Sequence, residues 1–231
     1  MRYLLSFKLF IAVLFVPAAA QAQNFALGAG LGTLGPEVFA TMKLTKNFDA
    51  LVGFSSLDYD DTFSDADANT FKATATIEAP RLGVQFFPLS KFGLFLEGGM
   101  VFGAPEIGVE YIADANAQFD VGGTIYNATD IGTLTGTTGF EADSAPYFLA
   151  GFGRTVGGGL GISLSAGLIS YGAMSVDLKN SQCTLGSNIL ERTQLCGALQ
   201  TNLLIEESRI NSDLEAFELW PFLRVGLSYS F

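Results

Sequence analysis

The C-terminal segment alternates strictly between apolar and other side chains. From residue 217 to residue 231 every odd position is apolar, whereas the even positions include Glu218, Arg224 and Ser228. Successive side chains of a strand point to opposite faces, so this segment predicts a strand with one fully apolar face. Such a face is typical of a barrel strand that contacts lipid.

Similar patterns predict seven earlier strands, and the lengths of the connections between them indicate how the strands are arranged. Short turns alternate with long connections, which is the arrangement of outer-membrane barrels. The sequence therefore predicts an all-β fold, a transmembrane antiparallel up-and-down β-barrel of eight strands, in which Gly32–Gly35 forms a very short outer hairpin. Ten strands are the alternative, if 104–144 contributes a hairpin near 119–126. The predicted strands are 24–31, 36–44, 48–57, 70–87, 92–103, 145–154, 160–171 and 216–231, with short turns at 45–47, 88–91 and 155–159 and long connections at 58–69, 104–144 and 172–215.

A soluble secreted barrel or sandwich would turn the same apolar face inward, and alternation alone does not separate the two folds. The opposite face decides between them. It is rich in Gly, Ser and Ala and carries few charges, which suits the cramped bore of a narrow barrel. We therefore expect the apolar face to point outward.

The N-terminus has the three parts of a secretory signal in their usual order. Arg2 and Lys8 supply positive charge, residues 9–16 are apolar, and Ala20-Gln21-Ala22 supplies small residues for cleavage. A buried N-terminal helix is the alternative. We expect residues 1–22 to be a cleaved signal and residues 23–231 to form the barrel domain in the outer membrane of a Gram-negative bacterium.

Composition limits the chemistry. The chain has a net charge of -11, with no basic patch, which argues against nucleic acid as a partner. It has no His, the usual base that activates a nucleophile, and no evident pair of catalytic carboxylates, so we expect no enzyme activity, no cofactor and no metal.

The two cysteines, Cys183 and Cys196, predict one disulfide that closes a local loop, because an exported chain meets an oxidising compartment. Two free thiols are the alternative. Two cysteines without a His do not make a structural zinc site.

Several segments resemble a known class of barrel. Residues 25–32, 38–48 and 51–54 resemble the opening of small OmpA-like and OmpW-like outer-membrane barrels. Residues 225–231, with Leu227, Tyr229 and Phe231, look like the C-terminal signal that the outer-membrane assembly machinery recognises in this class. The resemblance implies a monomer surrounded by lipid and lipopolysaccharide. Members of the class include anchors, adhesins, narrow channels and a few enzymes, and the connection 172–215 is longer than in typical members.

A group of charges is predicted to point into the bore. Arg81, Glu97, Glu218 and Arg224 are placed to meet there, whereas Glu37, Lys43 and Asp49 are inward-facing but near the rims. A charge in a narrow bore must be paired or hydrated. The group therefore forms either a salt-bridged plug or a selectivity and gating network.

The connection after the third predicted strand is strongly acidic, with Asp58, Asp60, Asp61, Asp65 and Asp67 close together. It resembles the start of an EF-hand loop but lacks the Gly and the bidentate Glu that such a loop requires. The two interpretations are a solvated acidic loop and a weak site for divalent cations.

The segment before the last strand predicts a short amphipathic helix over 199–214, since Leu203, Leu204 and Ile210 are spaced among charged residues. The helix would lie on the outer leaflet, cap the barrel mouth or pack within the loop.

Much of the sequence lies in 104–144 and 172–215, so we expect a non-catalytic structural or surface-interaction protein that acts through long extracellular loops. A narrow channel for small solutes or apolar molecules is the alternative.

Overall fold

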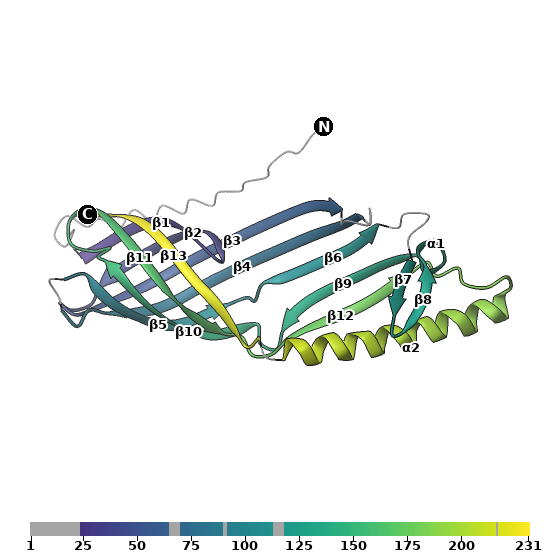
Figure 1. Ribbon diagram of the computed structural model, residues 1–231. Coiled ribbons are helices and arrows are strands. Elements are labelled where there is room, and N and C mark those ends of the chain that lie inside the picture. The colour runs from purple at the N-terminus through teal and green to yellow at the C-terminus, as the bar shows by residue number, and fades with distance from the viewer. Residues whose placement is uncertain (1–23, 65–69, 90–91, 113–117, 216) are drawn as a thin grey trace, which may run out of the picture.

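The computed structural model describes residues 24–64, 70–89, 92–112, 118–215 and 217–231. The predicted signal segment lies outside this range. Within it the chain forms a mostly antiparallel β structure with one long helix (Figure 1). The elements are β1 (Phe25–Gly32), β2 (Gly35–Lys43), β3 (Phe48–Ser64), β4 (Thr70–Phe86), β5 (Leu94–Phe102), β6 (Glu106–Ile112), β7 (Gln118–Val121), β8 (Thr124–Asn127), α1 (Ala128–Ile131), β9 (Thr133–Phe140), β10 (Ser144–Gly153), β11 (Gly159–Ser170), β12 (Met174–Ser181), α2 (Ile189–Leu214) and β13 (Leu219–Ser230).

Eight of these strands form a closed ring in the order β1, β2, β3, β4, β5, β10, β11, β13. The first and last strands of the chain pair with each other, with Ala26 opposite Ser230, and β4 pairs with β5 from Arg81 to Phe86. Closure leaves no unpaired backbone edge around the ring. The eight predicted strands correspond to these eight elements, so the predicted barrel is confirmed.

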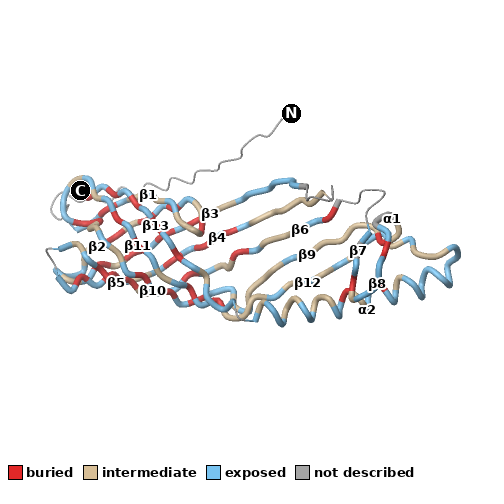
Figure 2. Tube along the Cα trace, in the orientation of Figure 1, coloured by how far each residue is buried: buried red, intermediate tan, exposed pale blue. Residues whose placement is uncertain are grey.

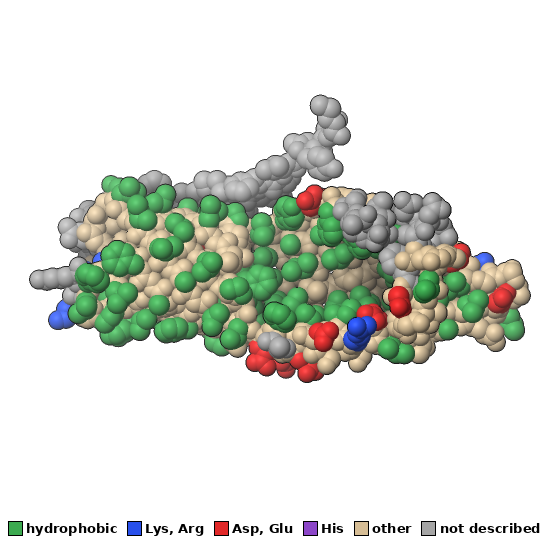
Figure 3. All heavy atoms as spheres, in the orientation of Figure 1, with side chains coloured by type: hydrophobic (Ala, Val, Ile, Leu, Met, Phe, Trp, Pro, Cys, Tyr) green, Lys and Arg blue, Asp and Glu red, His purple; other side chains and the backbone are tan. Residues whose placement is uncertain are grey.

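The ring turns its apolar face outward. On β13 the side chains of Leu219, Leu223 and Leu227 are 53%, 54% and 54% exposed, whereas Arg224 is 1% exposed. Figure 3 shows hydrophobic side chains spread over the outside of the ring. The soluble-barrel alternative, with these leucines inside, is wrong.

The barrel wall continues beyond the ring as an open sheet, which we call the extension. Only the second half of β4 pairs with β5, because Thr70–Thr76 pairs with β6 instead. β6 then pairs with β9, and β9 with β12. Figure 2 shows that buried positions gather in the ring and become sparse along the extension. Much of the three predicted long connections is therefore folded.

A hairpin forms where the ten-strand alternative placed one, but it is not part of the barrel. β7 and β8 pair only with each other, with Phe119 opposite Tyr126. Ten strands in the ring is therefore wrong, and the hairpin packs on the extension side of the molecule (Figure 1).

Helix α2 is confirmed but is longer than predicted, at 26 residues. It begins earlier because Asn188 caps it by accepting a hydrogen bond from the Glu191 N–H at 3.0 Å. The Ser187 hydroxyl and N–H in turn donate to the Glu191 carboxylate, which lowers the pKa of Glu191. The buried Leu199 and Leu203 of α2 pack against the β7–β8 hairpin and α1 rather than on the ring.

No helix among the residues placed by the structure is long and apolar enough to cross a membrane.

Side chains of α2 cover the free edge of the extension. The Asn211 amide accepts from the Val176 N–H at 2.7 Å and donates to the Val176 carbonyl at 3.2 Å. The Glu207 carboxylate accepts from the Leu178 N–H at 3.0 Å. An uncovered edge strand is a template for pairing with other chains, so α2 protects β12 from such pairing.

The disulfide between Cys183 and Cys196 is present, as predicted. It joins the segment that follows β12 to the first half of α2. The helix is thus attached covalently to the chain just after the edge strand that it covers.

We predict that Asn211→Ala opens the β12 edge locally, because it removes both hydrogen bonds to Val176. The free energy of opening at the Val176 N–H should fall by about 1–3 kcal/mol. Hydrogen exchange measured by mass spectrometry on the folded protein checks this. Ser208→Ala, at an exposed position of the same helix, is the control, and equal exchange in the two variants would contradict the edge-covering role.

Candidate functional site: a charged cluster in the bore

The bore of the ring is arranged in three layers along its axis. The inward side chains of β13 show this in order, starting from the extension end: Trp220 and Phe222 are apolar, Arg224 is charged, and Ser228 and Ser230 are small and polar. Strand β4 repeats the order, with Ile77 and Ala79 followed by Arg81 and then Gln85. On these two strands the buried charged side chains therefore lie in the middle layer.

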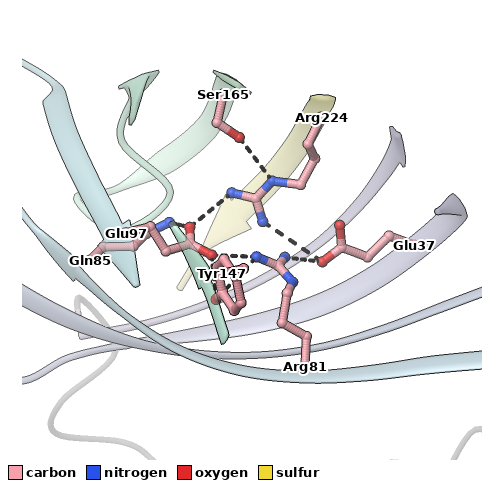
Figure 4. A network of polar contacts seen from close by, with 7 residues as sticks. All are labelled: Glu37, Arg81, Gln85, Glu97, Tyr147, Ser165 and Arg224. Carbon is pink, nitrogen blue, oxygen red and sulfur yellow. Dashed lines mark hydrogen bonds and ion pairs between the residues drawn. The ribbon is translucent and has the colours of Figure 1, made fainter. Parts of the chain in front are cut away.

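The middle layer is a cluster of two arginines and two glutamates, which we call the charged cluster (Figure 4). Arg81 pairs with both Glu37 and Glu97. Arg224 lies 3.2 Å from Glu97 and 3.7 Å from Glu37, measured between nitrogen and oxygen. All four side chains are at most 2% exposed. The formal charges cancel, which removes the large cost of isolated buried charges.

Three polar neighbours complete the cluster. The Tyr147 hydroxyl and the Gln85 amide each donate to the Glu97 carboxylate, both at 2.8 Å. The Arg224 Nε donates to the Ser165 hydroxyl at 3.3 Å. Glu97 thus accepts from four side chains on three other strands and lies at the centre of the network.

Aromatic rings pack against the arginines. The Arg81 guanidinium carbon lies 5.4 Å from the Tyr147 ring centroid and 5.3 Å from that of Phe222. The Arg224 guanidinium lies 5.4 Å from the centroid of Phe39. Cation–π contacts of this kind stabilise the arginines in place of water.

The layer nearest the extension is an apolar plug. Its buried side chains come from five strands of the ring and from two of their connections, and they pack into one continuous cluster. Tyr171 lies in this layer and donates its hydroxyl proton to the Gly103 carbonyl at 3.0 Å. The buried members are Leu34, Ile77, Ala79, Val101, Ala145, Tyr147, Leu149, Ile169, Tyr171 and Phe222.

The layer at the short-turn end is mixed. Phe39 and Phe95 lie directly over Gly28 and Gly151, where an added Cβ would overlap the rings. Glycine is therefore required at these two positions for the rings to fill the bore. The same layer holds buried polar groups, among them Asp49, which is 0% exposed and whose carboxylate oxygens accept no hydrogen bond within the described residues.

Sequence reasoning placed three of the four charged residues correctly. Arg81, Glu97 and Arg224 meet as predicted, but Glu218 does not join them. It precedes the first residue of β13 and is exposed, because the inward register of that strand begins only at Trp220. Its place is taken by Glu37, which was predicted to face inward but near the rim.

The structure describes three of the five carboxylates of the acidic segment, and these three are not grouped as metal ligands. Asp58, Asp60 and Asp61 lie on β3, which continues to residue 64 instead of ending at 57. Alternation along the strand turns Asp61 away from the other two, and Asp61 accepts from the Tyr59 hydroxyl at 2.9 Å. Asp65 and Asp67 lie outside the described residues. Among the residues described, no three His, Cys, Asp or Glu side chains are grouped so as to hold a metal ion.

The predicted assembly signal lies on the outer surface at the short-turn end. Leu227, Tyr229 and Phe231 are 53% to 54% exposed on the apolar face of β13 and just beyond it. The Phe231 N–H donates to the Phe25 carbonyl at 3.2 Å, which joins the end of the chain to the first strand. Recognition by assembly machinery stays a prediction.

The fold is shared with solved structures. No family model and no curated protein matches the sequence. The crystal structure of CarO from Acinetobacter baumannii matches with a TM-score of 0.60 at 19% identity, over 90% of this chain and 98% of that one. The structure of CarO2 from the same organism matches with a TM-score of 0.61 at 16% identity, over 92% of this chain and all of that one. At these identities the likeness concerns the fold.

We predict that Glu97→Gln destabilises the barrel strongly, because two buried arginines would then face one carboxylate. The free energy of unfolding should fall by about 3–5 kcal/mol, the usual cost of breaking a buried pair. Urea titration of the protein in lipid vesicles measures this, with the folded fraction read from the gel mobility of unheated samples. Glu218→Gln is the matched control and should leave the midpoint unchanged, and equal loss in both variants would contradict the assignment.

Proposed function

We propose that the protein is an integral outer-membrane barrel that does not conduct and that carries the extension outside the cell. The support for membrane insertion is the apolar outer face of the ring. Leu27, Val52, Leu82, Ile162 and Leu223 lie on five different strands, and each is about half exposed or more. A soluble protein rarely exposes an apolar surface of this extent.

The two packed layers in the bore, the apolar plug and the charged cluster, are the observation that carries the proposal. A solute crossing the ring would meet the apolar plug and then the charged cluster. The plug holds Tyr147 and Phe222, whose rings are 5.8 Å apart, directly beside Arg81. Passage requires both layers to separate, and separating the cluster exposes buried charges without partners.

A closed barrel leaves the extension and α2 as the working part of the molecule. The first ring strand begins near Phe25 and the last one ends near Phe231. These two points lie together at the short-turn end, opposite the extension. In an outer-membrane barrel the short turns face the periplasm. The extension, the β7–β8 hairpin and α2 then face the cell exterior, which favours a surface-interaction role.

Other expectations accompany this proposal. The protein is a monomer among lipid and lipopolysaccharide, inserted by the outer-membrane assembly machinery after cleavage of residues 1–22. It needs no cofactor and catalyses no reaction.

We predict no steady conductance in planar bilayers for the wild-type protein. Arg81→Ala and Arg224→Ala should also be silent, because the apolar plug stays in place. Single-channel recording checks both statements, with a known open porin as the positive control. Steady wild-type openings whose size changes in either variant would instead support the narrow-channel alternative.

A further inference from the structure

An open cavity of about 420 Å³ lies between the inner face of the extension and the elements that pack over it. The sheet side is formed by β4, β6, β9 and β12, and the covering side by β7 and α2. The apolar lining is continuous, from Phe71 and Tyr111 on the sheet to Leu203 and Ile210 on the helix. The size lies within the range of pockets for small molecules.

A glycine creates the floor of this cavity. Gly136 on β9 lies opposite Val109 on β6 and opposite Leu178 on β12. Both neighbours contribute side chains to the lining. An added Cβ would lie 3.2 Å from the tip of Leu178, so a larger residue at this position would project into the cavity.

The lining carries charge of one sign. Its two charged residues are Asp120, from β7, and Glu206, from α2, and it includes no Lys or Arg. Asp120 is exposed, and one of its oxygens accepts from the Gly123 N–H at 2.8 Å. The Glu206 side chain is 28% exposed, and Arg209 lies 3.9 Å from it but is 76% exposed, directed to solvent. Two carboxylates on an apolar cavity favour a cation, and the net charge of -11 adds long-range attraction.

We infer that this cavity binds a small amphiphile with an apolar body and a positively charged amine. The apolar body occupies the space above Gly136, and the ammonium group pairs with Asp120 and Glu206. The cavity is separate from the charged cluster, since it lies in the extension and shares no lining residue with the cluster. This inference rests on the proposed function only in placing the cavity at the cell surface.

The test is fluorescence titration of the purified full-length protein in detergent with dansylcadaverine, an apolar fluorophore with an alkyl ammonium chain. A dansyl derivative with a carboxylate chain of similar length is the comparison probe. We expect the fluorescence of the ammonium probe to rise and shift to the blue on binding. The carboxylate probe should bind about tenfold more weakly, because it lacks the charged contact of the ammonium group and a contact of this kind contributes about a factor of ten in affinity.

Two kinds of variant separate the parts of the inference. Gly136→Leu fills the floor and should abolish binding of both probes. Asp120→Asn combined with Glu206→Gln should weaken the ammonium probe by about tenfold and leave the carboxylate probe no weaker. Glu110→Gln, an exposed position that alternates with the lining residues Val109 and Tyr111, is the matched control and should bind like wild type.

Unchanged binding of the ammonium probe in Gly136→Leu would overturn the assignment of the cavity. Equal affinity of both probes for the wild type, or no loss in the Asp120→Asn, Glu206→Gln double variant, would overturn the choice of a cation. Because this assay needs no membrane, its failure leaves the conductance result intact, and open-channel behaviour leaves the titration intact. The mobility of unheated samples on gels confirms that each variant keeps its barrel.

Discussion

The neutralisation of two buried arginines is the constraint on which this barrel depends. Arg81 and Arg224 point into the bore, where each is 1% exposed, and each pairs with carboxylates from other strands. Glu37 and Glu97 supply them from β2 and β5, so the cluster connects four strands around the ring. A buried pair contributes little net stability compared with an apolar substitute, but it penalises every arrangement in which a partner is missing. We therefore interpret the cluster as fixing the register and closure of the ring more than as a store of stability.

Strand β4 explains how a narrow ring and a wide extension coexist in one chain. Its second half pairs with β5 and belongs to the ring, whereas its first half pairs with β6 and belongs to the extension. The exchange of partners ends the curvature needed for closure. It also creates a new open edge at β12, and Asn211 and Glu207 of α2 satisfy the backbone groups of that edge. The helix is thus a structural requirement of the open sheet as well as a wall of the cavity.

The strands of the ring could be predicted from the sequence, whereas those of the extension could not, for physical reasons. Apolar alternation is strong in strands with lipid on one side, so all eight ring strands and the outward direction of Leu223 could be predicted. In the extension both faces are partly exposed, as on β9, where most positions are intermediate, and the period-2 signal fades. Glu218 was misplaced because alternation gives the face of a residue but not where pairing starts. Glu37 was predicted to lie near the rim because the shear of the barrel cannot be read from one strand. Shear staggers neighbouring strands, so that residues at different positions along their strands lie at the same height in the bore.

The layers of the bore and the cavity of the extension follow from one distribution of small residues. In the ring, glycines such as Gly28 and Gly151 lie under aromatic rings, so the space they leave is filled by those rings. In the extension, Gly136 has no ring above it, only the ends of Leu178 and Val176, so the space stays open as a cavity. The same residue type therefore closes one part of the molecule and opens another. What differs is whether an aromatic ring or only the end of an aliphatic side chain from the neighbouring strand lies over the glycine. This depends on cross-strand register and explains why composition alone does not locate a binding site.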